Sequence, residues 1–179
     1  PQPEASRLAS YWMRQVLNKA ATELDDLFAK YRISEALTLV YKLIRDDFSS
    51  SYLELIKPAY GSPIDETTCR EALDFFDEIL RILHPFMPFI TEELWQNLAE
   101  RADGESIMNA QQRPAEAYDE AFLARFAAAQ EIITTVRSLR TSKNLSPREA
   151  LALEASPSYP TALDEVLIKM AGLSAIDRS

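Results

Sequence analysis

Apolar residues recur at intervals of three and four positions along the first part of the chain. The recurring positions are Met13, Leu17, Ala20, Leu24, Leu27 and Tyr31. This spacing places side chains on one face of an α-helix, so it predicts a long amphipathic helix over residues 4–30. Arg7, Tyr11, Arg14 and Asn18 fall on a different face of that helix. An amphipathic helix of this kind buries its apolar face against other elements, which favours a helical bundle.

Four further helices are predicted from the same spacing and from the prolines that interrupt it. They span about residues 34–57, 66–83, 89–102 and 119–143. Ser34 is an acceptable N-cap for the second helix, and Pro58 ends it because the residue before a proline is driven out of the α region. Pro85 and Pro88 cannot lie inside one continuous helix, since each removes an amide donor and crowds the preceding turn.

The apolar side chains of these helices are expected to form the interior. For the second and fourth helices this expectation includes Leu37, Tyr41, Ile90 and Leu94. It also covers the aromatic residues Phe48, Phe75, Phe76, Phe86, Phe89 and Trp95.

The last part of the chain has a different pattern. Residues 150–155 form a short apolar stretch, and residues 159–171 read as a helix that ends at Gly172, a favourable C-cap. The predicted fold class is therefore all-α. A helical bundle over residues 1–147 is followed by an incomplete small α/β unit over residues 148–179. The chain has only 3 glycines, which agrees with a fold poor in tight turns.

Charge is distributed unevenly along the chain. The net charge of -9 argues against nucleic-acid binding when it is taken as a whole. Residues 61–122, however, hold 14 acidic and 4 basic side chains, whereas residues 125–148 hold five basic and one acidic. Residues 1–20 are also basic on balance. Any RNA-binding surface is therefore expected at the two basic segments, away from the acidic middle.

No constellation of catalytic or metal-binding residues is found. His84 is the only histidine and precedes a proline, so a structural role is expected for it. One histidine and one cysteine, Cys69, cannot supply the four ligands of a structural zinc site. There is no glycine-rich phosphate loop. We therefore expect no catalytic residue, no metal and no cofactor in this chain, and no membrane span; a single cysteine fits a cytoplasmic setting.

Residues 83–95 read Leu-His-Pro-Phe-Met-Pro-Phe-Ile-Thr-Glu-Glu-Leu-Trp. This long segment resembles the helix-break motif of class I aminoacyl-tRNA synthetases for branched aliphatic amino acids, where it marks the helical bundle behind the catalytic domain. Leucyl, isoleucyl and valyl enzymes share its general form.

Three other stretches resemble the valyl branch of that family. They are the Glu-Ser-Ile-Met linker at residues 105–108 with Pro114 beyond it, the second helix from Ile33 to Pro58, and the spaced arginines of residues 136–140 followed by Asn144 and Pro147. Two alternatives stay open. One is the equivalent bundle of an isoleucyl or leucyl enzyme, and the other is an acidic helical protein-interaction module without an RNA role.

The resemblance implies a domain that receives the anticodon stem-loop of a valine tRNA. Trp12 matches a position where relatives place an aromatic residue near the anticodon, and Arg7, Tyr11 and Arg14 are candidate contacts. Weaker anticodon candidates are Gln15, Asn18 and Lys19. The second basic segment offers Arg137, Arg140 and Lys143 as candidate contacts to the tRNA backbone.

The resemblance also implies what lies outside this chain. Upstream catalytic and editing domains of the same polypeptide would perform the ATP-dependent esterification, with magnesium. The parent enzyme is expected to be monomeric.

Overall fold

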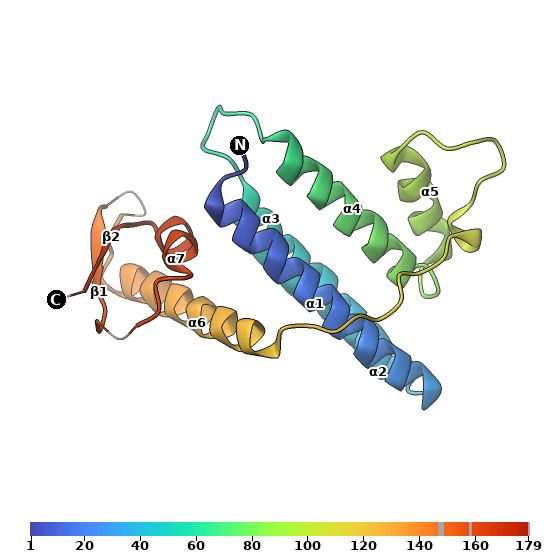
Figure 1. Ribbon diagram of the computed structural model, residues 1–179, viewed down its shortest axis with the longest axis horizontal. Helices are drawn as coiled ribbons and strands as arrows, with labels where there is room; N and C mark the ends of the chain where they lie inside the picture. The colour runs from blue at the N-terminus through green and yellow to red at the C-terminus, as the bar shows by residue number, and fades with distance from the viewer. Residues whose placement is uncertain (147–148, 158, 179) are drawn as a thin grey trace.

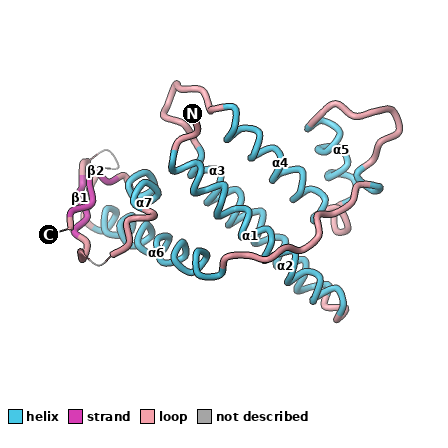
Figure 2. Tube along the Cα trace, viewed as in Figure 1, coloured by secondary structure: helices cyan, strands magenta, loops and turns pink. Residues whose placement is uncertain are grey.

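Helix α1 (Glu4–Ala29) is the central element of the molecule, and it packs against α2, α4, α6 and α7. The computed structural model describes residues 1–146, 149–157 and 159–178. Figure 1 shows α6 on one side of α1 and α4 on the other, with the strands at one end of the molecule and α5 at the opposite end. Helices make up most of the chain (Figure 2).

The return arm of the first hairpin is helical throughout but is not a regular α-helix. It comprises α2 (Ile33–Lys42), the π-helical segment η1 (Leu43–Tyr52) and α3 (Leu53–Ile56). Its start differs from expectation, because Arg32 is the N-cap residue and no side chain caps the helix.

The π-helical segment follows from where the apolar residues fall. Leu43, Phe48 and Tyr52 are buried at intervals of five and four, and the wider turn of a π-helix brings all three to the core. The Ser51 hydroxyl donates to the Asp46 carbonyl, 2.9 Å away. This bond reaches back five residues, as the backbone bonds of a π-helix do.

Helix α4 (Glu66–Leu83) begins at Asp65, whose carboxylate accepts a 2.9 Å hydrogen bond from the Thr68 amide. The break at the two prolines is confirmed, and α5 (Pro88–Leu98) follows it. His84 has the expected structural role: its Nδ1 lies 2.7 Å from the hydroxyl of buried Thr91 and so joins the two helices across the break.

A long linker connects α5 to α6 (Glu120–Ser142) and contains one short 3-10 turn, η2 (Ile107–Asn109). The Glu92 carboxylate holds this turn, accepting from the Ser106 hydroxyl at 2.8 Å and from the Ile107 amide at 3.0 Å. Asp119 caps α6 through a 2.8 Å bond from the Phe122 amide.

The C-terminal unit is a β–α–β arrangement of β1 (Leu151–Glu154), α7 (Asp164–Ala171) and β2 (Leu173–Asp177). The strands are parallel, as a crossover through a helix requires. Strand β2 was not predicted, and α7 is shorter than expected; Gly172 caps it in the left-handed conformation, at φ 64°. The predicted boundary at residues 147–148 lies outside the described residues.

One large core joins the bundle to the C-terminal unit, since Val166 and Leu167 of α7 pack in the same cluster as Met13 and Leu17 of α1. A separate small cluster of Leu80, Trp95 and Ile107 anchors α5. No helix among the described residues is long and apolar enough to cross a membrane.

Several residues expected in the interior are exposed, which corrects the interpretation from sequence. They are Tyr31, Leu37, Tyr41, Phe89, Ile90 and Leu94. Tyr31 lies in the turn between α1 and α2. For the other five the reason is geometric, because α2 and α5 each contact the bundle through one narrow face. Helical periodicity alone does not reveal that their second apolar face lacks a neighbour in the described structure.

Candidate nucleic-acid interface

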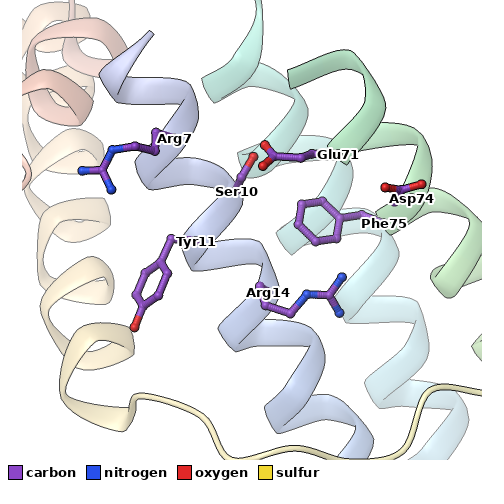
Figure 3. A pocket seen from close by; sticks show the side chains of 7 residues that line it. All are labelled: Arg7, Ser10, Tyr11, Arg14, Glu71, Asp74 and Phe75. Carbon is purple, nitrogen blue, oxygen red and sulfur yellow. The ribbon is translucent and has the colours of Figure 1, made fainter. Parts of the chain in front are cut away.

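Helices α1 and α4 enclose a groove of about 370 Å³ that brings together several of the predicted site residues. We call it the α1–α4 groove; its lining is Arg7, Ser10, Tyr11, Arg14, Glu71, Asp74 and Phe75. Figure 3 shows Arg7 and Tyr11 projecting from one side of α1, and Arg14 reaching from the other side toward α4. The groove thus collects two of the basic residues near the N-terminus beside an exposed aromatic ring.

Both arginines of the groove are held by carboxylates of the same chain. The exposed Arg7 donates from Nε to Glu4 at 2.7 Å, a bond that lowers the pKa of the Glu4 carboxyl and raises the pKa of Arg7. Arg14 donates to Glu78 at 2.7 Å, and its guanidinium lies 4.9 Å from the centre of the Phe75 ring. These pairs orient the guanidinium groups, although a phosphate would have to compete with the carboxylates.

Tyr11 is the accessible aromatic residue of the groove, with 44% of its surface exposed. An edge-to-face contact with Phe122 of α6 fixes the Tyr11 ring, with the ring centroids 4.8 Å apart and an interplanar angle of 84°. A ring that is both held and exposed loses little freedom when a planar group stacks on it.

The α4 wall of the groove carries acceptors. Glu71 accepts a 2.7 Å hydrogen bond from Gln2, and Asp74 is exposed and forms none of the ion pairs found among the described residues. The groove therefore offers cationic donors, an aromatic ring and anionic acceptors side by side. No pattern in the sequence singled out Glu71 or Asp74, because only tertiary packing brings α4 against α1.

Trp12 does not lie in this groove, and its predicted exposure to RNA is corrected. Only 3% of its surface is accessible, and its ring stacks on Phe126 of α6 at 4.6 Å with an interplanar angle of 13°. Its neighbour Tyr11 is exposed, whereas Met13 is fully buried, because a helix turns by about 100° per residue. In this arrangement Phe126 covers one face of the indole, and almost none of the side chain is accessible to a base.

Two other predicted contacts hold the linker instead of facing solvent. The buried Gln15 accepts from the Asp119 amide at 2.8 Å, and the buried Asn18 donates to the Ala117 carbonyl at 3.3 Å. Lys19 is partly exposed and lies 3.9 Å from Glu23. Of these three, only Lys19 presents an accessible charge.

The second basic cluster, Arg137, Arg140 and Lys143, also contains both buried and exposed residues. Arg140 is buried and donates to the carbonyls of Ser146, Glu149 and Gly172 at 3.1, 3.0 and 2.7 Å, so it joins the end of α6 to the C-terminal unit. Arg137 is exposed and donates to the Met170 carbonyl at 2.7 Å, while Lys143 is exposed. Arg140 is therefore a structural residue in this arrangement, which corrects its assignment as a surface contact.

A second cavity, of about 360 Å³, lies between α1, η1 and α6 beside Trp12. Asp47 and Gln130 line it with Lys19 and Lys42. Burial raises the pKa of Asp47 to about 6, and the positive charge of Lys42 opposes that shift only in part. Among the described residues, no group of three or more His, Cys, Asp or Glu side chains is arranged to hold a metal ion.

Comparison with known proteins agrees with this helical architecture. Residues 10–155 match the family described as the anticodon-binding domain of tRNA ligase. The valine–tRNA ligase of Porphyromonas gingivalis is 55% identical over 177 residues, and that of Parabacteroides distasonis is 49% identical over 177 residues; each alignment covers 99% of this chain and 20% of the relative. The valine–tRNA ligase of Geobacillus kaustophilus is 39% identical over 154 residues, covering 82% of this chain and 17% of the relative. The chain thus spans about a fifth of the length of these relatives.

Proposed function

The chain belongs to the family of anticodon-binding domains of tRNA ligases, and from this premise we propose that it binds the anticodon stem-loop of a valine tRNA within a valine–tRNA ligase. The observation that supports a binding surface is the α1–α4 groove, to whose lining α1 contributes Arg7, Tyr11 and Arg14. Cations that contact phosphates and an exposed ring that stacks a base are the means by which proteins bind single-stranded RNA loops.

The acidic wall of the groove supports binding of bases as well as phosphates. Valine codons begin with G and U, so the last two anticodon bases are A and C. Both bases carry an exocyclic amino group, which donates hydrogen bonds. Asp74 and Glu71 are acceptors at the wall opposite α1, and a carboxylate that accepts from the amino group of C is one of the contacts by which proteins read bases in DNA. We assign these two residues to base recognition and Arg7 and Arg14 to phosphates.

Lys19, Arg137 and Lys143 are proposed as additional contacts to the tRNA backbone, because their charges are accessible. Trp12, Gln15, Asn18 and Arg140 are proposed to act indirectly. Trp12 supports the helix that carries Tyr11, Gln15 and Asn18 hold the linker against α1, and Arg140 positions the C-terminal unit.

The remaining chemistry is assigned to parts of the ligase outside residues 1–179. The described residues include no candidate metal site, and the sequence has no glycine-rich phosphate loop. Binding of ATP with magnesium, esterification of valine and editing are therefore proposed for other domains of the same polypeptide. We propose that the full enzyme is cytoplasmic and monomeric.

Substitutions in the full-length ligase test the groove. We expect Tyr11→Ala to weaken tRNA binding by about 1–3 kcal/mol, the usual value of stacking one base on an aromatic side chain. Arg7→Ala should weaken tRNA binding several-fold, while valine-dependent ATP–pyrophosphate exchange stays unchanged for both variants. Filter binding or fluorescence titration gives the affinity.

Arg32→Ala is the matched control for Arg7→Ala. Each arginine is exposed, lies near the start of a helix and pairs with a glutamate three residues away, Glu35 for Arg32 and Glu4 for Arg7. Arg32 lies at the far end of the α1–α2 hairpin from Arg7. Equal losses of tRNA affinity in the two variants would contradict the groove assignment. Asp74→Asn should in turn reduce the discrimination between valine tRNA and anticodon variants more than it reduces overall affinity.

A further inference from the structure

Helix α5 carries a contiguous apolar surface that faces solvent. Met87, Phe89, Ile90 and Leu94 are 50%, 91%, 46% and 39% exposed. We call these four residues the α5 patch. Figure 1 places α5 at the end of the molecule opposite the strands, with α4 on one side of it. Scattered exposed apolar side chains are ordinary, but four within eight residues form a patch of the kind that marks an interaction site.

The apolar residues of α5 extend beyond the face that packs inward in the described structure. Thr91, Trp95 and Leu98 face inward, where Trp95 packs with Leu80 and Ile107 in the small cluster. At about 100° per residue, Phe89 lies on the opposite side of the helix from this inward face, and the other three patch residues lie on the flank that joins the two sides. This exposed apolar flank of α5 has no neighbour among the described residues.

Exposed acidic side chains lie beside the α5 patch and beyond it at the end of the helix. Glu93 lies on the same face as Phe89, one turn further along α5, and Glu100, Asp103 and Glu105 follow at the end of the helix; all four are exposed. None of the ion pairs found among the described residues includes these four carboxylates. The nearest arginine in the sequence, Arg101, is turned inward, with its guanidinium 3.6 Å from the centre of the Trp95 ring and bonded to Asp77. We call these four carboxylates the rim, and its charge is uniformly negative.

We infer that the α5 patch is an interdomain docking surface that binds an apolar, lysine- and arginine-rimmed surface of the same ligase polypeptide outside residues 1–179. Two observations select this occupant. The negative rim is complementary to a basic partner and would repel the phosphates of RNA. The curated relatives are about five times as long as this chain, so a covalently linked partner is present at high effective concentration.

This inference rests on the proposed function, because it requires that residues 1–179 are part of a longer ligase. The docking inference differs from the proposed function in what is bound, since the partner is a protein surface and not RNA. The α5 patch is also separate from the α1–α4 groove. Docking through α5 would hold the anticodon-binding bundle at a defined position relative to the other domains.

Photocrosslinking of the full-length enzyme tests the docking surface. Phe89→p-benzoylphenylalanine places a photoreactive ring at the most exposed position of the α5 patch, and Tyr60→p-benzoylphenylalanine places the same group on the exposed 58–64 loop as a control. After irradiation without tRNA, we expect position 89 to form an intramolecular crosslink to a peptide outside residues 1–179, with at least a fivefold higher yield than position 60. Peptide mapping by mass spectrometry identifies the attachment site.

Reversing the charge of acidic residues beside the α5 patch gives a second test of the docking surface. In the position-89 crosslinking enzyme, Glu93→Lys together with Glu100→Lys should reduce the yield at least threefold, whereas Glu131→Lys on the exposed face of α6 should not. Crosslinks confined to residues 1–179, crosslinks only between two copies, no crosslink, or a yield insensitive to the rim would each overturn the proposal. The measurement uses neither tRNA nor valine, so its failure is distinct from a failure of RNA binding.

Discussion

Tyr11 and Trp12 are adjacent in the sequence, but they serve different purposes in the structure. Trp12 is enclosed against Phe126, whereas Tyr11 is half exposed in the α1–α4 groove. The resemblance to synthetases drew attention to Trp12 as the aromatic contact. Because Trp12 is buried, we propose Tyr11 in its place as the aromatic residue that contacts RNA.

Substitution of these two residues should separate stability from binding. Trp12→Ala is expected to lower the free energy of unfolding of the chain by about 3–5 kcal/mol, because it removes a large buried ring and leaves a cavity. Tyr11→Ala should cost about 1 kcal/mol, mainly the edge contact with Phe122. Urea denaturation followed by circular dichroism measures both. A Trp12→Ala chain as stable as the parent would show that the indole is not part of the core.

Asp47 gives a pH-dependent prediction at the same scale. Its pKa is about 6 in the folded chain against an ordinary value of 3.8, so the folded state disfavours the charged carboxylate. The charged Asp47 therefore lowers the free energy of unfolding. This loss of stability is fully present above about pH 6 and disappears as pH falls through 6 toward 4.

Asp47→Asn should therefore stabilise the chain at neutral pH and not at acid pH. We expect a gain of about 1–2 kcal/mol at neutral pH, smaller than the shift in pKa alone implies because the side chain keeps some contact with water. The gain should vanish near pH 4. Thermal unfolding across this pH range measures it, with Asp25→Asn, at an exposed carboxylate of α1, as the control. A gain independent of pH would contradict the assignment.

At the scale of elements, the sequence predicts helices well where periodicity and breakers agree. Helix α4 has the predicted bounds, and α1 and α6 end within one residue of them. The double-proline break is also confirmed, with His84 bonded across it to Thr91. The π-helical segment was missed because its buried spacing of five and four depends on which residues the neighbouring helices accept.

Arg140 shows how one side chain connects two elements. It bonds three backbone carbonyls from the loop after α6 and the end of α7. Arg140→Ala should accelerate amide hydrogen exchange in β1 and β2 at least tenfold, since each hydrogen bond to a charged group contributes about 1.5–3 kcal/mol. Lys143→Ala, which removes a nearby exposed cation, should leave that exchange unchanged. Uniform acceleration across α1 and α4 would instead indicate global destabilisation.

At the scale of the whole molecule, charge is segregated between two regions. The accessible cations Arg7 and Lys19 lie on α1 with the partly buried Arg14, and the acidic segment over residues 61–122 includes α4, α5 and the linker. The net charge of -9 therefore describes neither region. The α1–α4 groove lies where the two regions meet.

This arrangement predicts weak, salt-sensitive tRNA binding by the chain alone. The 179-residue chain should bind tRNA at least tenfold more weakly than the full-length ligase, because its acidic surface repels phosphates. Its affinity should fall as salt rises, and Arg7→Ala should reduce the slope of log K against log salt by about 0.7. Titrations at several salt concentrations measure both slopes. A slope unchanged by Arg7→Ala would place the phosphate contacts elsewhere.

The sequence by itself determined the helical fold class, most helix bounds, the break at the prolines and the family. These features depend on local spacing, on the chemistry of proline and on a long motif, all of which can be read along the chain. Only the tertiary structure decided which candidate residues are accessible: it buried Trp12, Gln15, Asn18 and Arg140. It also brought Asp74 opposite α1 and left the outer face of α5 exposed. The physical reason is that exposure depends on neighbours distant in sequence, and helical periodicity specifies a face but not what covers it.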